Sequence, residues 1–211
     1  MAYSMDVLFQ RFPTLTKIKE PIEHSYTLIR DTFAQGNKLF ICGNGGSASD
    51  AEHIVGELMK GFLLKRELPQ AEQQKFIDAF GDEGADIAAK LQRGLPAIAL
   101  TSHPSLATAF NNDVDPSLTF SQQLYALGGD GDVLLAISTS GNSNNVVKCI
   151  QTAKVMGMKT IILAGNDGGK SAELCDCAVI APSNETYIIQ EFHLPIYHAL
   201  CAALEEHFYG E

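Results

Sequence analysis

The chain has 211 residues, of which 45% are hydrophobic and 19% charged, and its formal net charge is −10. This length and composition are typical of one globular domain with a sizeable core. No run of Lys and Arg forms a basic stripe, so direct binding to nucleic acid is not expected. The apolar stretches are too short to cross a bilayer, so we expect no membrane partner.

The cysteines and the first residues predict a cytoplasmic protein. Five cysteines are scattered along the chain, an odd number that favours reduced thiols in a cytosol. Cys175 and Cys177 form a C-x-C pair, which has neither metal-binding nor redox spacing, so we interpret both as structural. Asp6 stands early, and no basic start is followed by an apolar run, so no secretory signal is expected.

Hydrophobic spacing predicts helices alternating with short strands along the chain. Helical spacing begins at residues 17–35, which end at Gly36, a candidate C-cap. A buried strand is predicted at 38–42, and "ASDAEHIVGELMKGF" (48–62) continues as a helix. The highly charged stretch 63–94 predicts helices around a turn at Gly81–Asp82. Further strands are predicted at 97–101, 132–138, 160–165 and 178–182, and further helices at 143–156 and 185–206.

Strands of continuous Ile, Leu, Val and Ala separated by helices indicate a parallel sheet covered on both faces. We therefore predict an α/β fold: a single αβα sandwich over 1–211, with a five-stranded parallel doubly wound sheet, a helical N-terminus and a helical insertion at about 63–94. Ligands in such sheets bind beyond the carboxyl ends of the strands. Two of the predicted strands are followed at their carboxyl ends by loops of small polar residues, "GNGGS" (43–47) and "STSGNS" (138–143).

The "STSGNS" loop has the composition of a phosphate site. A helix N-terminus attracts anions through its free N–H groups and its dipole, and hydroxyl side chains add donors without bulk. The alternative is an ordinary Ser-rich turn that caps the helix from 143, but the second loop, "GNGGS", favours a phosphate. Neither G-x-G-x-x-G nor G-x-x-x-x-G-K-[ST] is present, so a small sugar phosphate fits better than a dinucleotide or ATP.

Two pairs of helical positions have the spacing of metal ligands. His53 and Glu57 stand at i,i+4, and Gln190 and His198 are eight residues apart, so each pair lies on roughly one helix face. Two imidazoles, a carboxylate and an amide oxygen could complete a zinc site. Each residue alone could equally be an ordinary helical side chain, and His193 is a rival ligand.

Three segments together, "CGNGGSASDAEH…GEL", "GDVLLAISTSGNSNNVVKCI" and "IIQEFHLPIYH", resemble the sugar isomerase (SIS) domain family, and within it the sedoheptulose 7-phosphate (phosphoheptose) isomerases. The resemblance implies a homotetramer with active sites at subunit contacts and a phosphorylated sugar as substrate. It implies substrate contacts from Asn44, Gly45, Gly46, Ser47 and Gln190, and phosphate contacts from Ser138, Thr139, Ser140 and Ser143. It also implies Zn²⁺ as cofactor, held by His53, Glu57, Gln190 and His198.

The implied reaction is the isomerisation of sedoheptulose 7-phosphate to D-glycero-D-manno-heptose 7-phosphate through an enediol, as a step of nucleotide-heptose biosynthesis. Glu57 would serve as base and His198 as acid, exchanging roles with direction, while zinc polarises the oxygens on C1 and C2. Two non-catalytic alternatives stay open: a SIS adaptor that binds a replication initiator, and a phosphosugar sensor.

The chain departs from the family pattern at several places, which leaves the exact sugar open. The stretch 63–94 stands where many members have a short link, and could form a lid, extend a subunit contact or alter which sugar fits. Ser102 or His103 replaces an Asp that is frequent in the family, and Tyr187 and Ile188 stand where polar residues are common. Asp167, in "GNDGG", is predicted to shape a turn.

Overall fold

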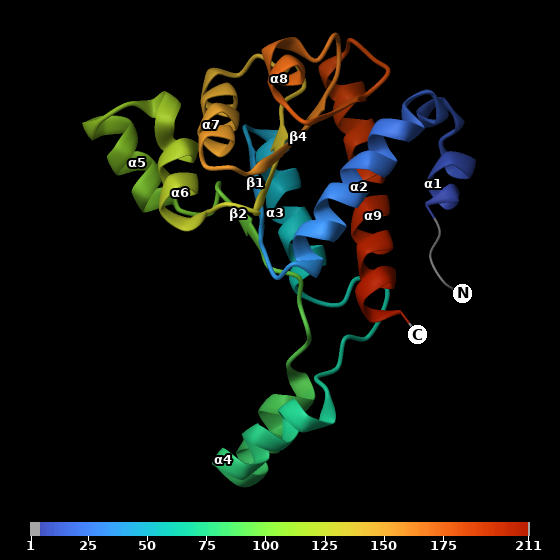
Figure 1. Cartoon of the computed structure of the whole chain (residues 1–211), viewed down its shortest axis with the longest axis vertical. Helices are drawn as coiled ribbons and strands as arrows, with labels where there is room; N and C mark the ends of the chain where they lie inside the picture. The colour runs from blue at the N-terminus through green and yellow to red at the C-terminus, as the bar shows by residue number, and fades with distance from the viewer. Residues whose placement is uncertain (1–4, 211) are drawn as a thin grey trace.

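The computed structural model describes residues 5–210 and contains a parallel sheet between two layers of helices (Figure 1). The five strands lie in the order β2-β1-β3-β4-β5, with every neighbouring pair parallel. This confirms the predicted α/β fold and its doubly wound sheet. The strand bounds are β1 Leu39–Gly43, β2 Ala97–Ala99, β3 Val133–Ile137, β4 Lys159–Ala164 and β5 Cys177–Ile180.

The helices agree with the predicted ones where the sequence has clear periodicity, and additional short helices fill the connections. Their bounds are α1 Asp6–Arg11, α2 Lys19–Ala34, α3 Gly46–Met59, α4 Gln70–Lys90, α5 Pro104–Asp113, α6 Thr119–Leu127, α7 Asn144–Val155, α8 Gly169–Leu174 and α9 Thr186–Tyr209. Two short 3₁₀ segments, Pro13–Ile18 and Pro116–Leu118, precede α2 and α6. Within residues 5–210, none of these helices is both long and apolar enough to cross a membrane.

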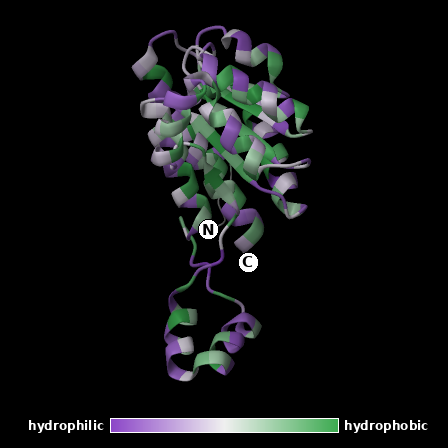
Figure 2. Ribbon diagram, turned by 90° about the vertical axis from the view of Figure 1, so that its left-hand side faces the viewer, coloured by the Kyte–Doolittle hydropathy of each residue, from purple (hydrophilic) through white to green (hydrophobic). Residues whose placement is uncertain are grey.

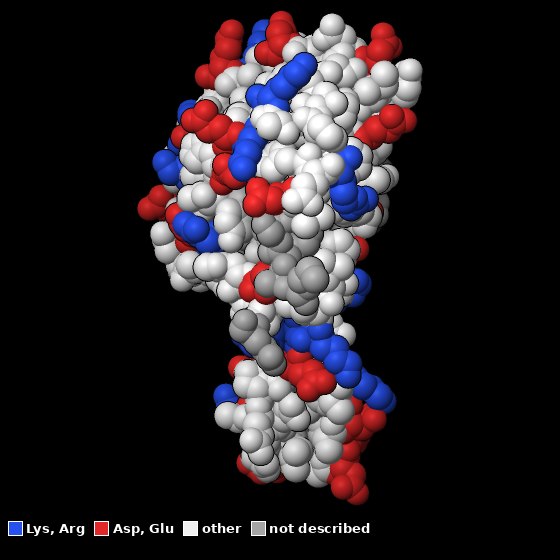
Figure 3. Space-filling model, turned by 90° about the vertical axis from the view of Figure 1, so that its right-hand side faces the viewer, with Lys and Arg blue, Asp and Glu red and all other residues white. Residues whose placement is uncertain are grey.

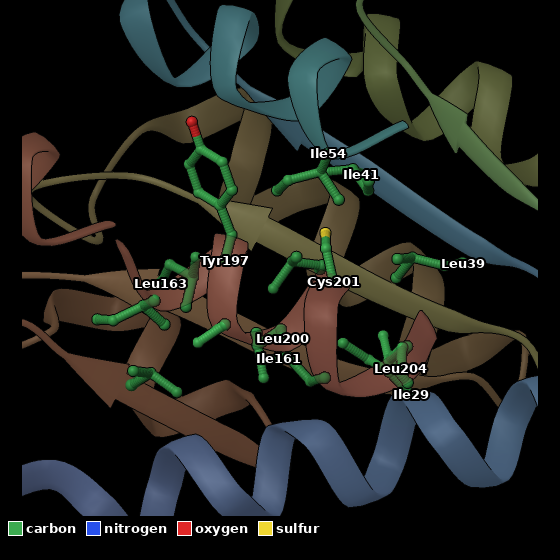
Figure 4. Close-up of a cluster of buried hydrophobic side chains, with 14 of the residues drawn as sticks. Ile29, Leu39, Ile41, Ile54, Ile161, Leu163, Tyr197, Leu200, Cys201 and Leu204 are labelled. Carbon is green, nitrogen blue, oxygen red and sulfur yellow. The ribbon is translucent and has the colours of Figure 1, made fainter. Parts of the chain in front are cut away.

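The hydrophobic core has two halves, one on each face of the sheet, because successive strand side chains point to opposite faces. On β1, Leu39 and Ile41 pack with α2, α3 and α9, whereas Phe40 and Cys42 pack with α6 and α7. The strands accordingly form the hydrophobic centre in Figure 2, and Figure 4 shows part of the first half. Burial on both faces explains why the strand sequences are continuously apolar.

An arm built from α4 projects from the body of the molecule (Figure 1). Gly81 breaks α4 with φ 58° and ψ −130°, as the predicted turn required, and the two halves fold back on each other. They pack closely, since a Cβ on Gly84 would lie 1.9 Å from the carbonyl oxygen of Phe76. The tip is acidic along one edge and largely uncharged beside it (Figure 3).

The prediction that 63–94 is helical is wrong at both ends, since the helix covers only Gln70–Lys90. Residues 61–69 and 91–96 instead form the neck of the arm, where Glu67 and Gln92 form an antiparallel bridge. Pro69 disfavours helical backbone in the residue before it, and therefore delays the start of α4. Pro96 acts likewise on Leu95, whose amide instead bonds the carbonyl oxygen of Leu58 at 2.9 Å.

Candidate active site

The two polar loops meet where the winding of the sheet reverses, between β1 and β3. Gly43, the last residue of β1, pairs with Ile137, the last residue of β3, so both loops leave the sheet at the same level. This is the point where doubly wound sheets bind ligands. Asn44 and Asn145 join the loops by reciprocal amide hydrogen bonds of 2.9 and 2.8 Å. The sequence analysis did not single out Asn145.

The serine loop is tightly built at the start of α7. Ser138 is buried, and its Oγ lies 3.2 Å from Oγ of Ser143, the N-cap residue of α7. Gly141 has φ 62°, and a Cβ there would lie 1.8 Å from the carbonyl oxygen of Gly168, so only glycine fits. Thr139 and Ser140 belong to the turn that precedes α7, and Ser140 Oγ accepts a hydrogen bond from the backbone amide of Asn142 at 3.2 Å. Such a turn can hold a phosphate without any basic side chain.

The glycine loop brings α9 close to the start of α3. Gly45 has φ 56° and is the N-cap residue of α3, while Ser47 in the first turn is buried. A Cβ on Gly46 would lie 2.4 Å from Nε2 of Gln190, so glycine at 46 is what allows the amide of Gln190 to approach. Gln190 therefore stands beside the glycine loop that the sequence predicted to contact substrate.

Further along α3 and α9, the structure brings together His53, Glu57 and His198. His53 Nε2 lies 3.2 Å from Glu57 Oε1, one helical turn away, as the i,i+4 spacing predicted. The rings of His53 and His198 have centroids 5.0 Å apart and meet edge to face. Burial and the neighbouring His53 lower the pKa of His198, so a neutral imidazole is favoured there.

Two atoms of this group are candidate ligand atoms. Glu57 Oε2 and His198 Nε2 are buried and have no hydrogen-bond partner, although Lys60 Nζ lies 3.6 Å from Glu57 Oε2. Unpartnered buried atoms of this kind call for a ligand or an ion. Nevertheless, over residues 5–210 no three side chains of His, Cys, Asp or Glu are already arranged to hold a metal ion.

His193, the rival ligand, points into the core. Its Nε2 lies 3.1 Å from the carbonyl oxygen of Ala164 at the end of β4, and the side chain is fully buried. Burial lowers the pKa of His193. The ring therefore packs α9 against the sheet and takes no part in the group around Glu57.

A second chain of contacts, absent from the sequence analysis, lies behind His53. The hydroxyl of Tyr197 donates to Asp50 Oδ1 at 3.2 Å and lies 3.1 Å from His53 Nδ1. Burial raises the pKa of the Asp50 carboxyl and of the Tyr197 hydroxyl. In the sequence, Asp50 stands one turn before His53, and Tyr197 stands immediately before His198. These spacings were the only features of the sequence that could have indicated the contacts.

The neck of the arm is fastened to the same two helices. Glu205 of α9 accepts hydrogen bonds from Arg66 Nε at 2.7 Å and from the backbone amides of residues 62–64 at 2.6–3.1 Å. Arg66 also donates to the carbonyl oxygens of Glu57 and Leu58 at the end of α3. Phe62 thereby lies against His198, with ring centroids 5.6 Å apart. A mostly apolar cavity of about 250 Å³ opens beside Phe62 and His198.

The remaining predicted positions have simple local roles. His103 precedes α5, and its Nδ1 lies 2.8 Å from Oε1 of the buried Gln123. The backbone amide of Ser102 bonds the carbonyl oxygen of Ala99. Asp167 accepts a hydrogen bond from the amide of Gly169 at 3.0 Å, which confirms the predicted turn. Tyr187 is 62% exposed at the start of α9.

Comparison with known proteins identifies the relatives of this chain. The SIS domain family matches residues 7–75 and 77–165. A phosphoheptose isomerase of Helicobacter pylori is 41% identical over 195 residues, 92% of this chain and 88% of its own length. One from Aliarcobacter butzleri is 39% identical over 188 residues, 89% of this chain and 86% of its own.

Solved structures give the same answer. Phosphoheptose isomerase from Neisseria gonorrhoeae superposes with a TM-score of 0.72 at 32% identity, covering 95% of this chain and 93% of its own. The enzyme from Francisella tularensis superposes with a TM-score of 0.76 at 29% identity, covering 93% and 91%. The chain therefore belongs to the SIS domain family and, within it, to the phosphoheptose isomerases, which are aldose-ketose isomerases.

Proposed function

We propose that the protein converts sedoheptulose 7-phosphate to D-glycero-D-manno-heptose 7-phosphate in a zinc-dependent reaction. The observation that carries the proposal is the grouping of His53, Glu57 and His198 along α3 and α9, the two helices that also bring Gln190 to the glycine loop. An acid, a base and candidate metal ligands thus lie on the two helices that meet at the glycine loop, which Asn44 joins to the start of α7 beside the serine loop.

The phosphate binds at the serine loop, where Ser138, Thr139, Ser140 and Ser143 surround the start of α7. Asn44, Gly45, Gly46 and Ser47 contact the sugar from the neighbouring loop. The amide pair between Asn44 and Asn145 keeps the two loops in one arrangement. Binding of the phosphate far from C1 and C2 contributes to catalysis because it fixes the reacting carbons against the acid and base.

Glu57 removes a proton from C1 of the ketose, and the enediol that results gains a proton at C2. Oε2 of Glu57 suits this task, since it is shielded from water and accepts no hydrogen bond within the chain. His198 is the acid partner. The two residues exchange roles in the reverse direction.

Zinc is held by His53, Glu57, the amide oxygen of Gln190 and His198. The donor set of two imidazoles, a carboxylate and an amide suits zinc, and the unpartnered Nε2 of His198 supports a ligand at this place. Glu57 Oε1, 3.2 Å from His53 Nε2, is the carboxylate oxygen for the metal, which leaves Oε2 to act as the base. When bound, the ion supplies a Lewis acid that polarises the oxygens on C1 and C2. Within residues 5–210 no three side chains of His, Cys, Asp or Glu are already arranged around an ion, so metal binding would require His53, Glu57 and His198 to reorient.

The test is turnover of sedoheptulose 7-phosphate by the purified protein, before and after removal of metal with a chelator and again after zinc is restored. We expect activity to disappear with the metal and to return with zinc. Glu57→Gln should abolish turnover while calorimetry still detects substrate binding. Glu83→Gln, an exposed change on the arm, is the matched control and should leave turnover unchanged.

The other outcomes identify the alternatives. Wild-type protein that contains zinc but does not convert this heptose would indicate a different phosphosugar. Binding without turnover would indicate a sensor. Neither zinc nor turnover would favour an adaptor. We also propose a homotetramer, which light scattering would detect as four times the chain mass of 22.8 kDa.

A further inference from the structure

We propose that Tyr197 and Asp50 are positioning residues that hold the imidazole of His53 with its hydrogen on Nδ1 and so leave Nε2 to bind the metal. The inference rests on the proposed zinc site. It concerns a chain of three side chains, Asp50–Tyr197–His53, that the proposed reaction does not use directly.

The hydrogen on Nδ1 follows from counting donors. An ionised carboxylate only accepts hydrogen bonds, so the single hydroxyl hydrogen of Tyr197 points to Asp50 Oδ1, 3.2 Å away. Toward His53 the same hydroxyl can then only accept. Because His53 Nδ1 lies 3.1 Å from that oxygen, the hydrogen between them belongs to Nδ1.

The consequence for the other ring nitrogen is direct. A neutral imidazole carries one N–H, so Nε2 of His53 presents a lone pair. That lone pair faces Glu57 Oε1 at 3.2 Å, where two acceptors oppose each other. A cation bound to both atoms removes the conflict. The arrangement therefore assigns Nε2 of His53 as the ligand atom, on the side of the ring that faces Glu57.

Tyr197 is well placed to position a more exposed partner. Its side chain is almost fully buried among core residues of α9 and β4, while the side chain of His53 is 41% exposed. In Figure 4 the Tyr197 ring points away from the centre of the cluster, with the hydroxyl oxygen at its outer end. Packing of the ring thus fixes the hydroxyl, and the hydroxyl fixes the orientation of His53. Partners of this kind tune metal affinity although they do not touch the metal.

Tyr197→Phe tests the inference because it keeps the buried ring and removes only the hydroxyl. We expect zinc affinity, measured by competition with a chromogenic chelator, to fall about 10- to 100-fold. The thermal midpoint of the metal-free protein should change little. Tyr125→Phe is the matched control: Tyr125 lies on α6 and is 70% exposed, so this variant should bind zinc as the wild type does.

The hydrogen position can be observed in metal-free protein. Two-dimensional ¹⁵N–¹H NMR of the histidine rings at pH 8 should show the Nδ1–H form of His53 in the wild type. Asp50→Ala frees the Tyr197 hydroxyl to donate to Nδ1, so this variant should shift His53 toward the Nε2–H form. Tyr197→Phe should give a mixture of both forms.

An Nε2–H form in the wild type would overturn the inference, as would a Tyr197→Phe variant that binds zinc within twofold of the wild type. Failure of the proposed function has a different signature. If wild-type protein binds no zinc, the metal site is refuted, while the NMR spectrum of the metal-free protein still decides whether Tyr197 and Asp50 set the hydrogen position.

Discussion

Replacement of Arg66 by alanine should strongly destabilise the protein, because this residue joins the neck of the arm to α3 and α9. The side chains of Arg66 and Glu205 are 0% and 1% exposed, and Arg66 Nε lies 2.7 Å from Glu205 Oε1. Truncation would leave the carboxylate buried without its cation. It would also leave the carbonyl oxygens of Glu57 and Leu58 without the donors they now have.

The magnitude follows from these contacts. Removal of one partner of a buried ion pair costs about 3–5 kcal/mol. Glu205 would keep its backbone donors from residues 62–64, so we expect the lower part of that range, about 3–4 kcal/mol. Arg66→Lys keeps the charge but cannot reach Glu205 and both carbonyl oxygens, so we expect a smaller loss than for alanine. The loss for alanine is large against a typical total of about 5–15 kcal/mol.

Equilibrium unfolding in urea, followed by circular dichroism, measures these losses, and an unchanged m-value shows that the unfolding transition is comparable. Lys65→Ala is the neighbouring control: its side chain is 88% exposed, and we expect a change within about 0.5 kcal/mol. An Arg66→Ala variant whose free energy of unfolding lies within about 1 kcal/mol of the wild type would refute the argument, since a buried carboxylate left without its cation destabilises the fold by more than that.

Three further predictions concern the loops and the core. In Gly141→Ala the alanine would have to adopt a positive φ, and its Cβ would clash with Gly168. KM for the phosphosugar should therefore rise, and the free energy of unfolding measured in urea should fall by about 1–3 kcal/mol. An unchanged KM would contradict this. Asn145→Ala removes both amide bonds to Asn44 and should raise KM roughly 5- to 10-fold with kcat nearly constant, which steady-state kinetics would show. Burial lowers the pKa of His193, so the unfolded chain takes up this proton first as the pH falls. Stability should therefore be complete above about pH 6.5 and fall below it, by at most about 1.4 kcal/mol per pH unit for this group. Urea midpoints of the metal-free protein at pH 7.5 and 5.5 should differ less for His193→Gln than for the wild type; equal differences would count against this.

The sheet could be predicted from the sequence because its signal is local. Strands buried on both faces are continuously apolar, and the two polar loops identify the strands whose ends carry the site. The i,i+4 spacing of His53 and Glu57 is likewise a property of one helix. That His198 joins them was expected only through the resemblance to a family, since no pattern along the chain shows which faces of α3 and α9 meet.

What escaped prediction depends on contacts between distant segments. Arg66 stands in "LLKREL", which has the composition of an exposed charged segment, and its burial requires Glu205, 139 residues away. In the sequence, Tyr197 resembles any aromatic residue of a buried helix. Only the structure shows that its hydroxyl lies between Asp50 and His53. The short helices α5 and α6 lie in a region for which periodicity predicted no element.

Because the neck holds the two ends of the arm together, the segment beyond it can be replaced by another without a change in the body of the molecule. Gly61 N bonds Gln92 Oε1 at 2.6 Å, and Arg93 N bonds the carbonyl oxygen of Arg66 at 2.7 Å, so the chain leaves and re-enters the body at one place. A segment with adjacent ends can lengthen, shorten or be exchanged without pulling on its host. The spacing of the catalytic helices therefore does not depend on the length of the arm, and a reporter domain inserted beyond the neck should leave that spacing unchanged.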